Sequence, residues 1–281
     1  MSEKFATKFN YYHHSPASTQ KPTEIDIFQK LLKARGEMIQ YPSVVTVGIA
    51  GEDYVKAELI DGLPSDAAYR HALARLDQHE LLPWDKQADE DRLQVHRDGA
   101  FELICQHASE GIKTALKGAN QITGQQKLEK NFAGLALPFL GFADFYGGNR
   151  IAELKCKTSL SADTKLGRRA GALPSKPDPK HAAQLSYYAN VMECPASLVY
   201  ANEKDYRIFD ETNCPELTPE GMNKALDDLR ARAWSRENLM RAAPDYRTLM
   251  QMLAPDFNDW GWRMNPKHLE EARKVWGLTT S

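Results

Sequence analysis

Residues 141–158 constrain the fold more than any other part of this 281-residue chain. Charged side chains alternate with small or apolar ones in residues 153–157, which is typical of a β-strand with one face packed on a core. Residues 141–146 form a second strand-like segment, and the sequence Gly-Gly-Asn at 147–149 is a turn of the type that closes a β-hairpin. The sequence therefore predicts two neighbouring antiparallel strands, and the fold must contain a β-sheet.

Other segments place this hairpin in an α/β fold. The β-branched segment Tyr-Pro-Ser-Val-Val-Thr-Val-Gly at 41–48 predicts a short strand or extended loop. A helical pattern occupies residues 181–192. Further strand-like runs lie at residues 126–132, 135–140, 196–201 and 205–209. We expect a mixed central β-sheet flanked by helices, with helical additions at the N- and C-terminal ends.

The pattern along the chain predicts four consecutive segments. Residues 1–23 are polar and without a usable period, which predicts a flexible N-terminal arm. Residues 24–92 form a helical N-terminal region, and residues 93–210 form the α/β core. Residues 211–281 form a helical C-terminal region packed on that core.

Composition excludes several classes of protein. With 42% hydrophobic and 26% charged residues, the chain lies in the ordinary globular range. The longest nearly apolar run has about 12 residues, fewer than the roughly 20 that a membrane helix needs. The first residues lack the apolar segment of a secretory signal, so we expect a cytoplasmic protein, in the host cytoplasm if a phage encodes it. The four cysteines are far apart and form no zinc-binding pattern.

Asp144, Glu153 and Lys155 are the residues that suggest chemistry. The hairpin brings Asp144 beside Glu153, and Lys155 shares the strand face of Glu153. Two adjacent carboxylates repel each other, and either the lysine alone or a divalent metal with it lowers that cost. Oxygen ligands favour Mg²⁺ or Mn²⁺, which promote phosphodiester hydrolysis. The alternative is that these charges form the solvated face of an edge strand.

The arrangement resembles the PD-(D/E)XK nuclease superfamily, and within it the RecB-like branch that includes phage exonucleases. That branch has a G-x-x-D strand, a (D/E)-x-K strand and a Q-x-x-x-Y helix, matched here by residues 141–144, 153–155 and 184–188. The resemblance implies a restriction-endonuclease-like core and a catalytic set of Asp144, Glu153, Lys155, Gln184 and Tyr188. It also implies that Asp144 and Glu153 bind the metal and that the Leu154 carbonyl adds a ligand. Gln184 and Tyr188 would steady Lys155 and contact the DNA end or backbone.

The resemblance implies one more metal ligand upstream. Phage-type members have a histidine in a helix that reads like R-G-T-x-V-H and follows a segment like Y-P-S-V-T-T-V. Here Tyr41 begins a similar segment, and His96 ends the sequence Arg-Leu-Gln-Val-His, in which Leu and Gln replace Gly and Thr. His96 is the first candidate, and Glu102 and His107 are the alternatives. Some members hold an iron-sulfur cluster with three late cysteines, whereas Cys214 is the only late cysteine of this chain, so we expect no cluster.

DNA would have to bind through a local patch, because 36 basic and 38 acidic residues give a net charge of −2. Residues 144–180 contain eight Lys and Arg against four Asp and Glu. If these basic side chains neutralise DNA phosphates, DNA binding should depend strongly on salt and show little sequence readout. The candidate DNA-binding residues are Lys157, Lys165, Arg168, Arg169, Lys176 and Lys180.

The sequence therefore favours a metal-dependent DNA exonuclease of the phage type, acting in recombination, repair or DNA degradation. An endonuclease of the same fold, specific for structured or single-stranded DNA, is one alternative. A catalytically idle DNA-binding or assembly module is the other. The resemblance implies linear duplex or single-stranded DNA ends as the partner. A recombinase or single-strand binding protein is a candidate protein partner, and the short apolar runs predict no membrane association. A homo-oligomer is an alternative to a monomer, because some phage exonucleases form rings.

Overall fold

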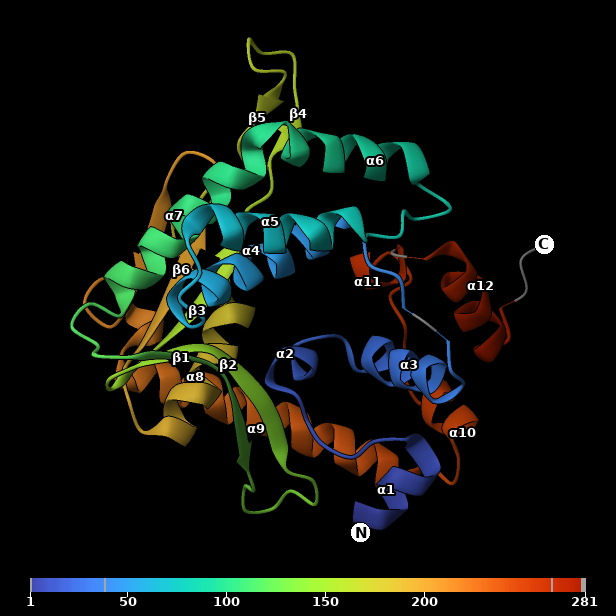
Figure 1. The fold of residues 1–281 in the computed structure, drawn as a ribbon. Helices are drawn as coiled ribbons and strands as arrows, with labels where there is room; N and C mark the ends of the chain where they lie inside the picture. The colour runs from blue at the N-terminus through green and yellow to red at the C-terminus, as the bar shows by residue number, and fades with distance from the viewer. Residues whose placement is uncertain (1, 38, 264, 279–281) are drawn as a thin grey trace. The chain divides into compact units, whose positions relative to one another are not determined.

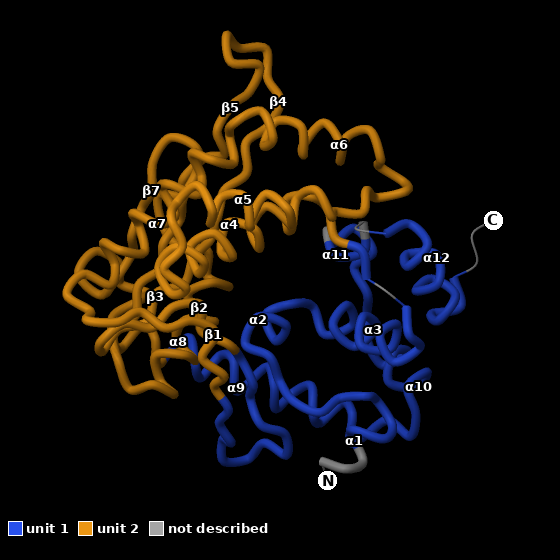
Figure 2. Tube along the Cα trace, in the orientation of Figure 1, with its two compact units in different colours: residues 1–40, 129–141, 224–281 blue, residues 41–128, 142–223 orange. Residues whose placement is uncertain are grey.

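The computed structural model describes residues 2–37, 39–263 and 265–278, and it is an α/β structure with a mixed, five-stranded central sheet flanked by helices (Figure 1). The chain divides into two compact units (Figure 2). The first unit comprises residues 1–40, 129–141 and 224–281, and the second comprises residues 41–128 and 142–223.

The sheet has the strand order β1-β2-β3-β6-β7. β2 and β3 are antiparallel, β3 and β6 are parallel, and β6 and β7 are antiparallel, so the sheet is mixed as the sequence predicts. A separate pair, β4 and β5, is antiparallel. The strands are β1 (Ile122–Lys130), β2 (Phe139–Gly147), β3 (Arg150–Cys156), β4 (Leu160–Ser161), β5 (Arg168–Arg169), β6 (Ala196–Ala201) and β7 (Tyr206–Phe209).

Helices of the second unit cover both faces of β3 and β6. Ala152 and Leu154 of β3 are buried with Val199 of β6 in a core cluster that also contains residues of α4, α5 and α7. Lys155 and Tyr200 are paired across β3 and β6, and α8 lies on their face. The helical elements of this unit are α4 (Ser43–Leu59), α5 (Ser65–Asp77), α6 (Lys86–Val95), the π-type turn η1 (His96–Ala100), α7 (Phe101–Ala115), α8 (Pro179–Met192) and the 3-10 turn η2 (Pro215–Leu217).

The first unit is mainly helical, and its core joins the two ends of the chain. Phe5 and Phe9 are buried in one cluster with Phe28, Met240 and Leu249. The helices are α1 (Ser2–Phe9), α2 (Pro16–Thr19), α3 (Thr23–Ala34), α9 (Pro219–Ala242, which begins in the second unit), α10 (Tyr246–Gln251), α11 (Trp260–Arg263) and α12 (Pro266–Val275).

The N-terminal segment differs from the flexible arm that the sequence predicts. Residues 2–23 contain α1, α2 and the start of α3, and Tyr11 is fully buried. The Tyr11 hydroxyl donates to Asp26, which also forms a 2.7 Å ion pair with the buried Arg236. Arg236 is 210 positions after Asp26, so nothing local in this polar segment signals that it is anchored.

The boundaries between segments differ as well. Residues 41–92, expected in a separate helical region, pack against the sheet, because α4 supplies Val47, Ala50 and Tyr54 to the cluster around β3. The predicted short strand or extended loop at 41–48 is wrong, since Ser43 begins the 17-residue helix α4. The predicted strand at 135–140 is also wrong over most of its length, because β2 begins at Phe139.

None of the helices in residues 2–37, 39–263 and 265–278 has both the length and the hydropathy that a bilayer span requires.

Candidate functional site

The hairpin of β2 and β3 brings together the three side chains that the sequence singles out. Gly148 in the turn adopts φ = 64°, a left-handed conformation that glycine accepts without strain. The Lys155 ammonium lies 3.1 Å from Glu153 Oε2 and 4.0 Å from Asp144 Oδ2. Glu153 is 1% exposed and Asp144 is 8% exposed, so this group of charges is buried rather than spread on a solvated edge.

The ladder between β2 and β3 opens where the carboxylates lie. Paired residues run from Gly147 and Arg150 to Phe145 and Ala152, and one further step would place Asp144 opposite Glu153. At this step the backbone N–H groups donate to the two carboxylates instead of to backbone carbonyls. The Asp144 N–H donates to Glu153 Oε1 at 3.2 Å, and the Leu154 N–H donates to Asp144 Oδ2 at 3.2 Å. Both carboxylates are thus oriented by the strand backbone.

Burial dominates the electrostatics of this group. Burial, followed by the charge of Glu153, raises the pKa of Asp144 from 3.8 to about 7, although Lys155 acts in the opposite direction. Burial alone would lower the pKa of Lys155, but the charges of Glu153 and Asp144 outweigh it and raise that pKa above its ordinary value. One ammonium therefore stabilises two carboxylates incompletely, and a further cation would find a favourable position here.

Gln184 and Tyr188 of α8 lie beside this group. Gln184 Nε2 donates to the Tyr188 hydroxyl at 2.9 Å, as expected for residues four apart on one helix face. Burial, and then the charge of Glu153, raises the pKa of the Tyr188 hydroxyl above its ordinary value. The hydrogen bond of Gln184 goes to Tyr188, whereas the ammonium of Lys155 is held by the two carboxylates.

His96 does not join the carboxylates in this structure. It lies at the start of η1, where Nδ1 is 2.6 Å from the Arg92 carbonyl and Nε2 accepts the Ser159 N–H at 3.2 Å. Because Nδ1 donates to a carbonyl, Nε2 has the only lone pair available for a metal, and Ser159 occupies it. Burial lowers the pKa of His96, so its ring is neutral at pH 7. The structure gives His96 a role in holding the loop at Ser159.

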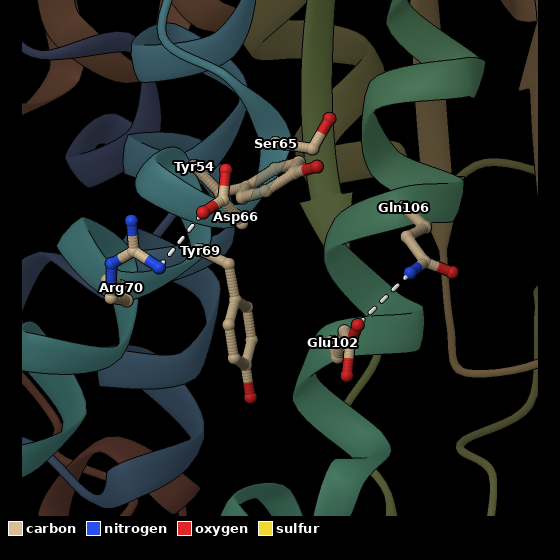
Figure 3. Close-up of a pocket in the computed structure, with 7 residues that line it drawn as sticks. All are labelled: Tyr54, Ser65, Asp66, Tyr69, Arg70, Glu102 and Gln106. Atoms are coloured by element: carbon tan, nitrogen blue, oxygen red, sulfur yellow. Dashed lines mark hydrogen bonds and ion pairs between the residues drawn. The ribbon is translucent and has the colours of Figure 1, made fainter.

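The two alternatives to His96 also have other partners. His107 Nδ1 is hydrogen-bonded to the Asn202 carbonyl at 2.9 Å. Glu102 accepts a hydrogen bond from Gln106 and faces a separate cavity of about 340 Å³ between α5 and α7 (Figure 3). The residues that line this cavity are Tyr54, Ser65, Asp66, Tyr69, Arg70, Glu102 and Gln106.

Glu52 is the upstream carboxylate that the sequence analysis missed. It lies on α4, directly after Gly51, where an added Cβ would meet Cys156 Sγ of β3 at 2.6 Å. Glu52 accepts hydrogen bonds from Lys56 and, at 3.0 Å, from Gln125. Burial, and then the charge of Asp144, raises the pKa of Glu52. No local pattern marks Glu52 as a ligand, because its proximity to Asp144 depends on how α4 packs against the sheet.

The candidate DNA-binding residues are not equivalent. Arg168 forms a 2.6 Å ion pair with the buried Glu203 and donates to the Asp98 carbonyl at 2.9 Å, so it fastens the β4-β5 hairpin to η1. Its guanidinium is therefore already engaged. Lys157 has its ammonium 5.1 Å from the centroid of the Tyr200 ring. The exposed members of the set are Lys165, Arg169, Lys176 and Lys180.

The donor set suits a hard divalent cation in its chemistry. Asp144, Glu153 and Glu52 offer carboxylate oxygens, which Mg²⁺ and Mn²⁺ prefer. In the described part of the chain, however, no three His, Cys, Asp or Glu side chains are arranged as a ready ligand cluster. Asp144 and Glu153 are the two carboxylates that Lys155 contacts, so a cation bound there would share them with that ammonium.

Comparisons with known proteins add little to this geometry. No protein-family model matches the sequence, and no curated protein matches it. Among solved structures, the crystal structure of SSO0001 is similar with a TM-score of 0.27 and 17% sequence identity, over 73% of this chain and 83% of that one. A similarity of this size leaves the site to be interpreted from its own residues.

Proposed function

We propose that the protein is a divalent-metal-dependent deoxyribonuclease of the PD-(D/E)XK superfamily, with a restriction-endonuclease-like core, and that it removes nucleotides from DNA ends. The observation that supports this proposal is the buried group in which one lysine contacts two carboxylates, with the pKa of Asp144 raised to about 7. A structural ion pair has no need of the second, uncompensated carboxylate, whereas a metal site does.

Mg²⁺ or Mn²⁺ would be held by Asp144 and Glu153, with the Leu154 carbonyl as a further oxygen and Glu52 next to the pair. The ion would polarise a phosphodiester oxygen and acidify a water. Lys155 would lose part of its ion pairing once the carboxylates are neutralised, and its ammonium would then stabilise the negative charge that develops on the phosphorus centre. Tyr188, held by Gln184, would limit the access of bulk water to Lys155.

The proposal extends to the setting of the reaction. DNA is the substrate, and the exposed Lys165, Arg169, Lys176 and Lys180 neutralise its phosphates. A phage-type exonuclease of this kind would act in recombination, repair or DNA degradation, and no iron-sulfur cluster takes part in the reaction. Arg168 does not contact DNA in this proposal, and instead holds the β4-β5 hairpin that contains Arg169.

Digestion of labelled DNA tests this function. Linear duplex and single-stranded DNA, labelled at either end, should lose label with Mn²⁺, and a covalently closed circle should stay intact. Cutting of the circle would instead establish the endonuclease alternative. Lys155→Ala and Asp144→Ala should each lower the rate at least about 100-fold. Asp61→Ala, at an exposed position outside both the carboxylate group and the basic segment 157–180, is the matched control.

Metal binding separates an enzyme from an idle module. Calorimetry should detect Mn²⁺ binding to the wild-type protein and no binding to Asp144→Ala. Folded wild-type protein that neither binds Mn²⁺ nor degrades any of the DNA substrates would refute the proposed function.

A further inference from the structure

Tyr200 connects the candidate site to a histidine that has no role in the proposed function. It is the cross-strand neighbour of Lys155, so the two side chains share the face of the sheet that α8 covers. Its hydroxyl oxygen accepts the Asp178 N–H at 3.0 Å and lies 2.8 Å from His181 Nδ1. His181 is in the first turn of α8, three residues before Gln184 and on the same helix face.

This hydrogen-bond chain favours one tautomer of His181. Of the two contacts of the Tyr200 hydroxyl, only His181 Nδ1 can accept its proton, because Asp178 contributes an N–H donor. With the hydroxyl donating to Nδ1, a neutral imidazole has its own proton on Nε2. Burial, and then the charge of Lys155, lowers the pKa of His181 to about 4, so the ring is neutral at pH 7 and Nε2–H is a donor.

The donor is surrounded by positive charge. Lys155, Lys157 and Lys180 all act electrostatically on His181, against the single carboxylate of Asp178. Lys157 lies over the Tyr200 ring, 5.1 Å from its centroid. Lys155 is held by Glu153 and Asp144, whereas neither Lys157 nor Lys180 forms an ion pair with any carboxylate that the structure describes. Around His181, three ammonium groups thus outnumber the carboxylate of Asp178, and two of the three have no ion-pair partner among the described residues.

We infer that His181 Nε2–H, Lys157 and Lys180 form a subsite for a phosphate group of the nucleic acid strand, adjacent to the phosphate that is cut. The inference rests on the proposed function for the identity of the strand. A phosphate supplies the anionic oxygens that two ammonium groups and an N–H donor complement. Tyr200 is a positioning residue, because it sets the tautomer that makes His181 a donor.

The subsite can be tested without cleavage, with inorganic phosphate and metal-free protein. Side-chain ¹⁵N NMR should show the His181 Nε2 signal, identified by its loss in His181→Gln, shifting as phosphate is added. Lys155→Ala should keep this response, because the subsite does not require the cutting step. Tyr200→Phe should change the ¹⁵N shifts to those of a mixture of tautomers. A His181 signal that does not move at saturating phosphate would overturn the inference.

Kinetics with DNA give the second test. His181→Gln should raise KM about tenfold and leave kcat within about twofold. Removal of a lysine that contacts a phosphate lowers the slope of log affinity against log salt by about one, and His181→Gln should lower that slope by less. His71→Gln, at an exposed position, is the matched control. An unchanged KM in a folded His181→Gln protein that still cuts DNA would overturn the subsite and leave the proposed function standing.

The same assay identifies which phosphate is bound. Substrates with a 5′-phosphate, a 3′-phosphate or hydroxyl ends differ only in the terminal group. If the effect of His181→Gln on KM vanishes on hydroxyl-ended DNA, the subsite binds a terminal phosphate. If the effect persists on every substrate, it binds an internal phosphodiester. If wild-type protein binds inorganic phosphate through His181 but cuts no DNA, the proposed function fails and the anion site remains.

Discussion

Asn in place of Asp144 should make the metal-free protein more stable, although it removes a residue of the candidate site. The Asp144 side chain is 12% exposed, and its charge lies beside that of Glu153. Asn keeps the shape of the side chain, and its Oδ1 can still accept the Leu154 N–H. Lys155 keeps its 3.1 Å contact with Glu153. The substitution therefore removes mainly the free energy of ionising a buried carboxyl.

The magnitude follows from the pKa of Asp144. A rise from 3.8 in the unfolded chain to about 7 in the folded protein is about 3 pH units. At about 1.4 kcal/mol per unit, ionised Asp144 lowers the free energy of unfolding by at most about 4 kcal/mol. Because this pKa is raised by folding, the loss is absent below about pH 4, grows as the pH rises, and is complete above about pH 7.

Thermal unfolding followed by circular dichroism in EDTA measures the effect. At pH 8 the Asp144→Asn protein should have a higher midpoint than wild type, and at pH 4 the two midpoints should nearly coincide. Mn²⁺ at 100 times its dissociation constant should raise wild-type stability by about 2.7 kcal/mol and leave Asp144→Asn unchanged.

Asp163→Asn removes a carboxylate at an exposed position and should match wild type at both pH values. If folded Asp144→Asn is no more stable than wild type at pH 8 in EDTA, the carboxylate pair is not destabilising. The reasoning that connects burial with a metal site would then be refuted.

Three further predictions concern the metal and the packing of α4. Calorimetry should show the Mn²⁺ affinity rising about tenfold per pH unit up to about pH 7 and levelling above it, because Asp144 must lose its proton before it can bind the ion. An Mn²⁺ affinity that stays constant from pH 5 to 8 would contradict this. Glu52→Gln should lower the Mn²⁺ affinity about tenfold, with DNA cleavage restored by excess metal, whereas an unchanged affinity would place Glu52 outside the site. Gly51→Ala should destabilise the protein by about 1–3 kcal/mol in urea unfolding, because the added Cβ meets Cys156 Sγ. Gly48→Ala, in the same helix, places its Cβ in open space and should stabilise the protein by up to about 1 kcal/mol. Equal effects at Gly51 and Gly48 would rule out the close approach.

Short-range periodicity was sufficient for the central hairpin and for the helix of Gln184 and Tyr188. Alternation in β3 separates Glu153 and Lys155 from Leu154, and the Gly-Gly-Asn turn sets the pairing of β2 with β3. These features depend on neighbours within about ten positions, which a single sequence displays.

The segment of α4 could not be assigned in the same way. Its Val-Val-x-Val run has the composition of a strand, and the helix is recognisable only when Val47, Ala50 and Tyr54 are counted together as one buried stripe. Tertiary packing against β3 and α7 overrides the local preference of valine. Glu52 follows this run in residues expected to be helical, and it was missed because its electrostatic interaction with Asp144 depends on the tertiary packing of α4.

The N-terminal helices were missed because their partners are distant in sequence. His14 is bonded to Glu237 at 3.0 Å, and the same carboxylate accepts the N–H groups of Ala136 and Leu137. One buried glutamate on α9 therefore organises two segments that have no regular pattern of their own. No property of residues 1–23 or 135–140 alone predicts such an anchor.

The open end of the β2-β3 ladder has a consequence for the speed with which an ion is captured. Asp144 and Glu153 are each clamped by an amide of the opposite strand, so folding has already selected their rotamers. A cation that binds there does not have to order these two carboxylates, so little of their conformational entropy is lost on binding. Once Lys155 gives up part of its ion pairing, exchange of the ion should be limited mainly by loss of its hydration shell rather than by rearrangement of these two carboxylates.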